Sequence, residues 1–207
     1  MGNQEVKVEG LLYDRDGRAI FSDGGYEAAV KGRVVAASSA TGGIAIIAAA
    51  TTGGHPTLWN PLGSGRIMEV LSLSVAYVSG NNAPGGLAWN LVKNTGATAA
   101  TGASSPILTA TKVDVESAMI GGVVDSKLYF APTVNTFTAA PTYGRPISLS
   151  LFTGVAATAV APFQMYEKYD RNNPLLIAPG AAICLVTSQA TTTSLLRYTV
   201  MVEEHDE

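Results

Sequence analysis

Two histidines are the first residues to consider for chemistry in this chain of 207 residues, because histidine is the commonest metal ligand and acid–base group near neutral pH. His55 and His205 lie at opposite ends of the chain, and no His-x-His pair occurs. A metal-dependent enzyme of the cupin type needs His and Glu clustered on neighbouring strands, so this pattern argues against that class. We expect His55 in a loop and His205 in a solvated acidic tail, with adventitious metal binding as the alternative for His205.

Three other features of the sequence contain acidic or thiol side chains that could take part in metal binding or catalysis. Residues 14–17, Asp-Arg-Asp-Gly, resemble the start of a calcium loop but lack its later ligands, so we interpret them as a turn. Asp114 and Glu116 could form an acid–base pair, although an exposed strand face explains them better. Cys184 lies in an apolar run and is expected to be a buried thiol. We therefore predict a protein that is not an enzyme, with no catalytic residue, no cofactor and no metal.

The composition limits the classes of partner. Charged residues make up 14% of the chain, hydrophobic residues 47%, and the formal net charge is −3. Disorder is not expected at this hydrophobicity, and the 13 Lys and Arg residues are too few and too scattered for nucleic-acid binding. The apolar run Ile44–Ala50 is shorter than the roughly 18 residues of a membrane helix, so no membrane partner is expected. A surface with few charges indicates that other subunits cover part of it.

Residues 1–56 are predicted to form an extended N-terminal arm with a small hairpin. The segments Val6–Tyr13 and Arg18–Phe21 flank the turn at residues 14–17, and a helical turn at Tyr26–Lys31 ends at Gly32. This region has too few large apolar residues to enclose its own core. A partner surface would bury its aromatic residues and pair with its arginines. The predicted partner-binding residues are Tyr13, Arg15, Arg18, Phe21, Tyr26 and Arg33.

Residues 57–207 are predicted to form an antiparallel β-sandwich of jelly-roll type. Residues 67–78 form a long strand in which Ile67, Leu71, Leu73, Val75 and Tyr77 share one face, with a bulge or an edge position at Glu69. The further predicted strands are Leu87–Lys93, Ile107–Val115, Val123–Phe130, Ile147–Phe152, Phe163–Tyr169, Leu175–Ile177, Ala181–Thr187 and Leu195–Glu203.

The core of this sandwich follows from the alternation of apolar residues. The predicted core residues are Leu71, Leu73, Val75, Ile183, Leu185, Tyr198 and Val200. Two low-complexity loops, Asn94–Ser105 and Val155–Ala161, are interpreted as mobile tips or as surfaces that lie against a partner.

Three short motifs carry a family resemblance. A Tyr-Glu-Ala…Gly-Arg segment begins at Tyr26, an Asn-Pro-Leu-Gly-Ser-Gly turn begins at Asn60 and leads into the long strand, and a Pro-Gly turn lies at residues 179–180. In this order the motifs resemble small structural proteins of tailed bacteriophages, of which capsid decoration (cement) proteins are the nearest type. The resemblance covers most of the chain from about residue 25.

This resemblance implies a structural protein of the virion, assembled in the host cytoplasm and bound to the major capsid protein. It also implies a homo-oligomer, for which we favour a trimer over a dimer. The alternative is a phage tail or receptor-binding component that engages a host surface glycan. Trp59, Trp89, Tyr129 and Tyr143 could line a sugar site, although packing in the core or an interface is the better interpretation.

Overall fold

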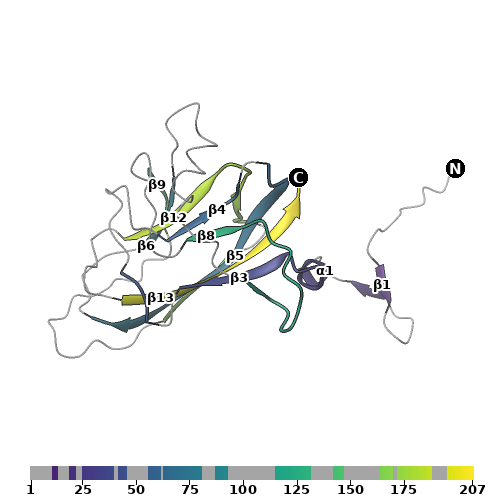
Figure 1. The fold of residues 1–207 in the computed structure, drawn as a ribbon, viewed down its shortest axis with the longest axis horizontal. Coiled ribbons are helices and arrows are strands. Elements are labelled where there is room, and N and C mark those ends of the chain that lie inside the picture. The colour runs from purple at the N-terminus through teal and green to yellow at the C-terminus, as the bar shows by residue number, and fades with distance from the viewer. Residues whose placement is uncertain are drawn as a thin grey trace.

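The computed structural model describes residues 11–13, 19–21, 25–39, 42–45, 56–61, 63–80, 87–92, 115–131, 142–146, 164–169, 172–187 and 195–207. These residues are mostly β-strand, arranged in two antiparallel sheets with a separate hairpin (Figure 1). The one helix of the described part is α1 (Gly25–Val30). The chain is therefore an all-β protein, as the sequence predicts.

The larger sheet contains six strands, and the two long ones form its centre. Its order is β10 (Gln164–Lys168), β5 (Arg66–Ser79), β13 (Leu195–Asp206), β3 (Val34–Ser38) and β7 (Glu116–Ser117), while β11 (Leu175–Ile177) also pairs with β5. β5 and β13 pair over almost their whole length. This pair is the framework on which the other strands of the sheet are placed.

The second sheet contains five shorter strands. Its order is β8 (Tyr129–Ala131), β4 (Thr57–Trp59), β12 (Ala182–Thr187), β6 (Leu87–Leu91) and β9 (Thr142–Pro146). Two further strands, β1 (Leu11–Tyr13) and β2 (Ala19–Phe21), form a hairpin that pairs with no other described strand. Figure 1 shows this hairpin beyond α1, away from both sheets.

The main core contains side chains from both sheets. Leu73 and Val75 of β5 and Tyr198 and Val200 of β13 belong to one buried cluster with residues of the other sheet, including Leu185 of β12. Ile183 belongs to the same cluster, so six of the seven predicted core residues are confirmed. The alternation of apolar residues predicted this layer because each strand buries one face against the opposite sheet.

Leu71 is the exception, and its position has a local cause. Met201 of β13 pairs with Ser72, whereas the next residue, Val202, pairs with Val70, so Leu71 is an extra residue in β5. Such a bulge moves the following side chains to the other face of the strand. Met68 and Val70 are therefore fully buried before the bulge, whereas Ile67 and Leu71 stay partly exposed. The prediction that Leu71 lies in the core was wrong, as was the prediction that Ile67 shares a strand face with Leu73 and Val75.

The boundary of the arm also differs from the sequence-based expectation. Residues 34–38, which we expected within the arm, form β3 and pair with β13, with Val35 and Ala37 fully buried in the core. Ile44 forms a further bridge to Leu196 of β13. The small side chains of β3 gave no strong local signal, because their burial depends on a strand more than 150 residues away.

Several other predicted segments can be compared with the structure. In place of Val123–Phe130, the strand β8 begins at Tyr129, and residues 118–128 contain no strand. The predicted strand Ile147–Phe152, nearly all of Ile107–Val115 and both low-complexity loops lie outside the described residues. No helix in the described part of the chain is long and apolar enough to span a membrane.

Candidate functional site

The side chain of Glu204 is the centre of a polar network at one end of β13. It is fully buried and accepts hydrogen bonds from the backbone amides of Lys127 (3.0 Å to Oε1 and 2.9 Å to Oε2) and Leu128 (3.1 Å). The Ser126 hydroxyl and Arg66 Nη1, the latter at 3.0 Å, donate to the same carboxylate. A buried charge is costly unless hydrogen bonds and an opposite charge replace its hydration, and Glu204 has both.

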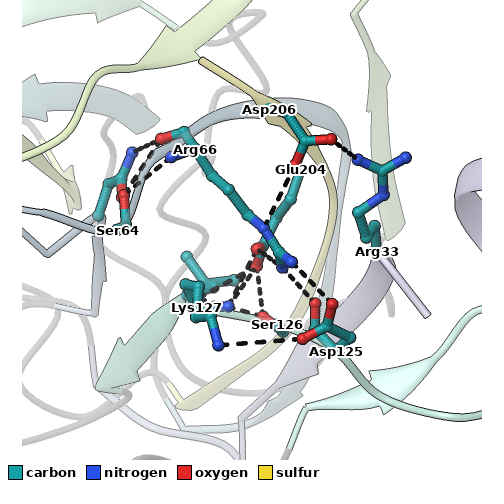
Figure 2. A network of polar contacts seen from close by, with 10 residues as sticks. Arg33, Ser64, Arg66, Asp125, Ser126, Lys127, Glu204 and Asp206 are labelled. Atoms are coloured by element: carbon teal, nitrogen blue, oxygen red, sulfur yellow. Dashed lines mark hydrogen bonds and ion pairs between the residues drawn. The ribbon is translucent and has the colours of Figure 1, made fainter. Parts of the chain in front are cut away.

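Arg66 connects this buried carboxylate to the surface. Figure 2 shows its guanidinium between Glu204 and Asp125, and Nη2 lies 2.7 Å from Asp125 Oδ2. The hydrogen bond from Arg66 lowers the pKa of Asp125 below its ordinary value. Burial by itself lowers the pKa of Arg66, but the hydrogen bonds to Asp125 and Glu204 outweigh it and raise the pKa. Asp206 extends the network to Arg33, whose Nη1 lies 2.7 Å from Asp206 Oδ2.

The network fixes one end of the loop at residues 118–124. At the other end, the Ala118 amide donates to the Val34 carbonyl of β3 at 2.9 Å. Asp125, just after the loop, donates its amide to the Gly32 carbonyl, also at 2.9 Å. Gly32 has a φ of +74°, and a Cβ at this position would lie 2.1 Å from the Val123 carbonyl oxygen. Hydrogen bonds therefore hold both ends of the loop, and Gly32 is needed because its backbone lies so close to the Val123 carbonyl.

Between these fixed ends the loop exposes apolar side chains. Ile120 is fully exposed and Val123 is 70% exposed, while Met119 and Val124 are each about two-fifths exposed. Val30, at the end of α1 and two residues before Gly32, is exposed to a similar extent. We call these five residues the apolar loop surface. Grouped exposed apolar side chains on a well-positioned loop are typical of a contact with another molecule.

Sequence reasoning missed this surface. The segment Met-Ile-Gly-Gly-Val-Val at 119–124 places two apolar pairs around two glycines, which is the pattern of a turn with an apolar tip. We assigned its second half to a strand because Val has a high β propensity. Glu204 was likewise grouped with an acidic tail, whereas β13 continues to Asp206 and buries Glu204 completely.

The predicted partner-binding residues of the arm lie in different surroundings. Tyr13 is in β1, Phe21 in β2 and Tyr26 in α1, whereas Arg15 and Arg18 lie outside the described residues. Arg33 lies beside the six-stranded sheet, where it pairs with Asp206 and its side chain is largely buried. The structure therefore places Arg33 with the sandwich rather than with the hairpin.

His205 lies on the opposite side of β13 from Glu204. Its Nε2 is 2.9 Å from Glu69 Oε2, and its Nδ1 is 3.9 Å from Glu203 Oε1. It is thus a strand residue with carboxylate partners, and the expectation of a solvated tail was wrong. His55 and Asp114 lie outside the described residues. Within the described part of the chain, no three His, Cys, Asp or Glu side chains are grouped so that they could hold a metal ion.

Two of the turn motifs behind the family resemblance lie against each other. The buried Asn60 side chain donates to the carbonyls of Arg66 (2.7 Å) and Ile177 (2.8 Å) and accepts from the Ser64 hydroxyl (2.6 Å). The Gly180 amide donates to the Asn60 carbonyl at 2.8 Å. Asn60 therefore holds the Asn-Pro-Leu-Gly-Ser-Gly turn and the Pro-Gly turn together, which is a structural role.

Both tryptophans and the cysteine singled out from the sequence are packed internally. Trp59 and Trp89 are buried. The ring centroids of Trp59 and Tyr129 lie 4.9 Å apart with the rings tilted by 50°, and Trp89 Nε1 donates to the Tyr169 hydroxyl at 2.8 Å. Cys184 is fully buried, and burial raises the pKa of its thiol. These observations agree with the packing interpretation of the tryptophans and with a thiol that behaves as a small apolar residue.

Comparisons of the chain with protein-family models, curated proteins and solved structures found no significant match.

Proposed function

We propose that this protein is a non-enzymatic structural protein of a tailed-bacteriophage virion, which binds and stabilises the capsid shell as a decoration or cement protein. The partner that we propose is the major capsid protein, and the arm is the proposed point of attachment. The β1–β2 hairpin, which pairs with no other described strand, carries this proposal. The family resemblance supplies the identity of the particle.

The strand pairing supports a jelly-roll body for the protein. Among the strands of the body, β3 pairs with β13, β4 with β12, β5 with β10, and β6 with β9. Early strands thus pair with late strands in nested order, and successive members of this set alternate between the two sheets. A chain folded into a jelly roll produces this nesting, and jelly rolls are frequent in viral capsid proteins. In this interpretation β7 and β8 are edge strands added to the body.

The hairpin supports a role in attachment. An isolated two-stranded ribbon is marginally stable in water, because it cannot bury apolar residues on both faces. The register pairs Leu11 with Phe21 and Leu12 with Ile20, so each face of the ribbon has an apolar pair. Docking on another protein would bury these residues, and Arg15 and Arg18, which lie between the two strands in the sequence, would pair with carboxylates of that protein.

The proposed location and assembly follow from the same interpretation. We place the protein on the virion as a homo-oligomer, with a trimer favoured over a dimer, because closed symmetry covers apolar surface on each copy. The tail or receptor-binding alternative becomes an outcome of the experiment below.

The test is the copy number of the chain in purified particles of the virus that encodes it, measured by quantitative mass spectrometry. A decoration protein is expected at a copy number comparable with that of the shell protein. A copy number far below that of the shell protein would indicate a tail component, and absence from the particle would overturn the proposal.

The attachment step is tested separately with particles that lack the protein. A variant without residues 1–24 keeps α1, Gly32 and Arg33, which contact the sandwich, and is expected to fold but to lose binding to the shell. The exposed Leu176 of β11 supplies a matched control, since Leu176→Ser leaves the arm unchanged. Unchanged binding of the truncated variant would show that the arm is not the attachment site.

A further inference from the structure

We infer that the apolar loop surface, formed by Val30, Met119, Ile120, Val123 and Val124, is the docking site for the β1–β2 hairpin of a second copy of this chain. This inference concerns the contact between copies and names both of its sides. It deepens the proposed assembly: the β1–β2 ribbon has an apolar pair on each face, so one face can dock on a second copy while the other contacts the shell. Its test uses the purified chain alone, so it can fail or succeed independently of the virion proposal.

The apolar loop surface is preorganised for binding. Ala118 is hydrogen-bonded to β3, and the Gly122 amide donates to the Met119 carbonyl at 2.8 Å, which closes a tight turn. Beyond the loop, three successive residues are held by Glu204. The conformation is therefore fixed by contacts made on folding, and a partner loses little entropy in ordering it.

The hairpin has the complementary properties. Its six strand residues are Leu, Leu, Tyr, Ala, Ile and Phe, and β1 and β2 pair with no other strand of the described part of the chain. Figure 1 shows the hairpin on the side of α1 that is farther from the sheets. The loop between β7 and β8, drawn in teal, extends on the side of α1 that is closer to the sheets. One chain thus presents an apolar ribbon and an apolar receiving surface that do not meet within the same copy.

These two surfaces differ from each other, so every copy can both donate a hairpin and receive one. Repeated head to tail, the contact closes into a ring when the rotation between copies allows it, and a trimer is one such ring. Two copies that exchange hairpins reciprocally would instead form a twofold dimer.

The first experiment measures the oligomeric state by size-exclusion chromatography with light scattering. The loop variant Ile120→Asp/Val123→Asp and the hairpin variant Leu12→Asp/Ile20→Asp are each expected to weaken self-association by roughly tenfold or more, because each places charges in an apolar contact. The control Leu176→Asp changes an exposed residue of β11 and is expected to assemble as the unmodified chain does. Circular dichroism verifies that each variant remains folded.

Mixing the two variants gives the decisive result. The loop variant retains an intact hairpin and the hairpin variant retains an intact loop, so a mixture is expected to form a one-to-one pair although neither variant assembles alone. A monomeric unmodified chain, an unchanged oligomer in either variant, or failure of the mixture to pair would overturn the inference.

Cysteine cross-linking identifies the contacting residues. Leu12→Cys and Ile120→Cys are made in separate chains, and the native Cys184 is buried and does not interfere. A disulfide-linked dimer is expected when the two chains are mixed under oxidising conditions. A disulfide that forms only within a chain carrying both substitutions would show that the hairpin docks on its own copy, which would overturn the inference.

Discussion

Glu204 and His205 are neighbours on β13, yet their surroundings are opposite. Glu204 faces inward, is fully buried, and accepts hydrogen bonds from Arg66, a hydroxyl and two backbone amides. His205 lies on the other face, where its side chain is 43% exposed and contacts Glu69, which is 18% exposed. The two contacts have similar lengths, 3.0 Å for Glu204 with Arg66 and 2.9 Å for His205 with Glu69.

This comparison shows that distance does not set the contribution of a polar contact to stability. On the exposed face, water competes for both partners and screens their charges, so the contact contributes little. On the buried face no water replaces a lost partner, so removal of one group leaves the others uncompensated. The buried network also fixes the apolar loop surface, which connects stability at this end of β13 to the proposed contact between copies.

The largest effect is expected for Glu204→Ala. This change removes the acceptor of the Lys127 and Leu128 amides and the buried carboxylate partner of Arg66, which keeps Asp125, so the free energy of unfolding is expected to fall by about 3–5 kcal/mol. Chemical denaturation measures the loss. Glu203→Ala, one residue away on the other face, is the matched control; its carboxylate lies 3.9 Å from His205 Nδ1, beyond hydrogen-bonding distance, so the change is expected to cost clearly less than Glu204→Ala. Equal losses in the two variants would contradict the comparison.

The second prediction concerns the close contact between Gly32 and the loop at residues 118–124. Gly32→Ala places a Cβ in a left-handed backbone conformation, at a cost of about 1–2 kcal/mol, and overpacking against the Val123 carbonyl adds about 1–3 kcal/mol. Gly63 has a similar φ of +76° but open space around its Cβ position. Gly63→Ala should therefore show the backbone cost alone. If thermal unfolding gave the same loss for both variants, the close approach of the loop would not matter for stability.

A smaller effect is expected for Asp125→Asn, and it depends on pH. The hydrogen bond from Arg66 lowers the pKa of Asp125 below its model-compound value of 3.8. The ionised carboxylate therefore contributes stability above pH about 4, and this contribution is lost as the pH falls through the lowered pKa. Because Asp125 is half-exposed, the effect should stay below about 1 kcal/mol. Denaturation is expected to show a smaller difference in unfolding free energy between the variant and the unmodified chain at pH 2.5 than at pH 7.

The smallest effect is expected for His205→Ala. Its contact with Glu69 is partly exposed to water, so the loss in unfolding free energy should lie between about 0 and 1 kcal/mol. High salt should reduce even this difference, since mobile ions screen exposed charges. A loss as large as that of Glu204→Ala would show that the outer face is covered in solution, and would identify it as a further interface.

The hairpin and the sandwich were predictable to different degrees. The turn motif at residues 14–17 and the apolar segments on either side predicted a hairpin from local signals, and the pairing of β1 with β2 confirms strands at Leu11–Tyr13 and Ala19–Phe21. Alternation also located β5, β12 and β13 within a few residues of their ends. The candidate site was not predicted, because the burial of Glu204 and the exposure of Ile120 depend on how a distant loop lies against β13.

The sequence by itself determined the all-β class, the positions of the long strands and most of the core, because a period of two residues and the conformations of turn residues are local properties. Tertiary structure alone decided which strands lie side by side. Residues 34–38 became a core strand because they pair with β13. The extra residue at Leu71 reversed which side chains of β5 face the core. The loop that binds Glu204 at one end leaves its apolar tip exposed. These outcomes depend on contacts between residues far apart in the chain, and no local pattern encodes the partner of such a contact.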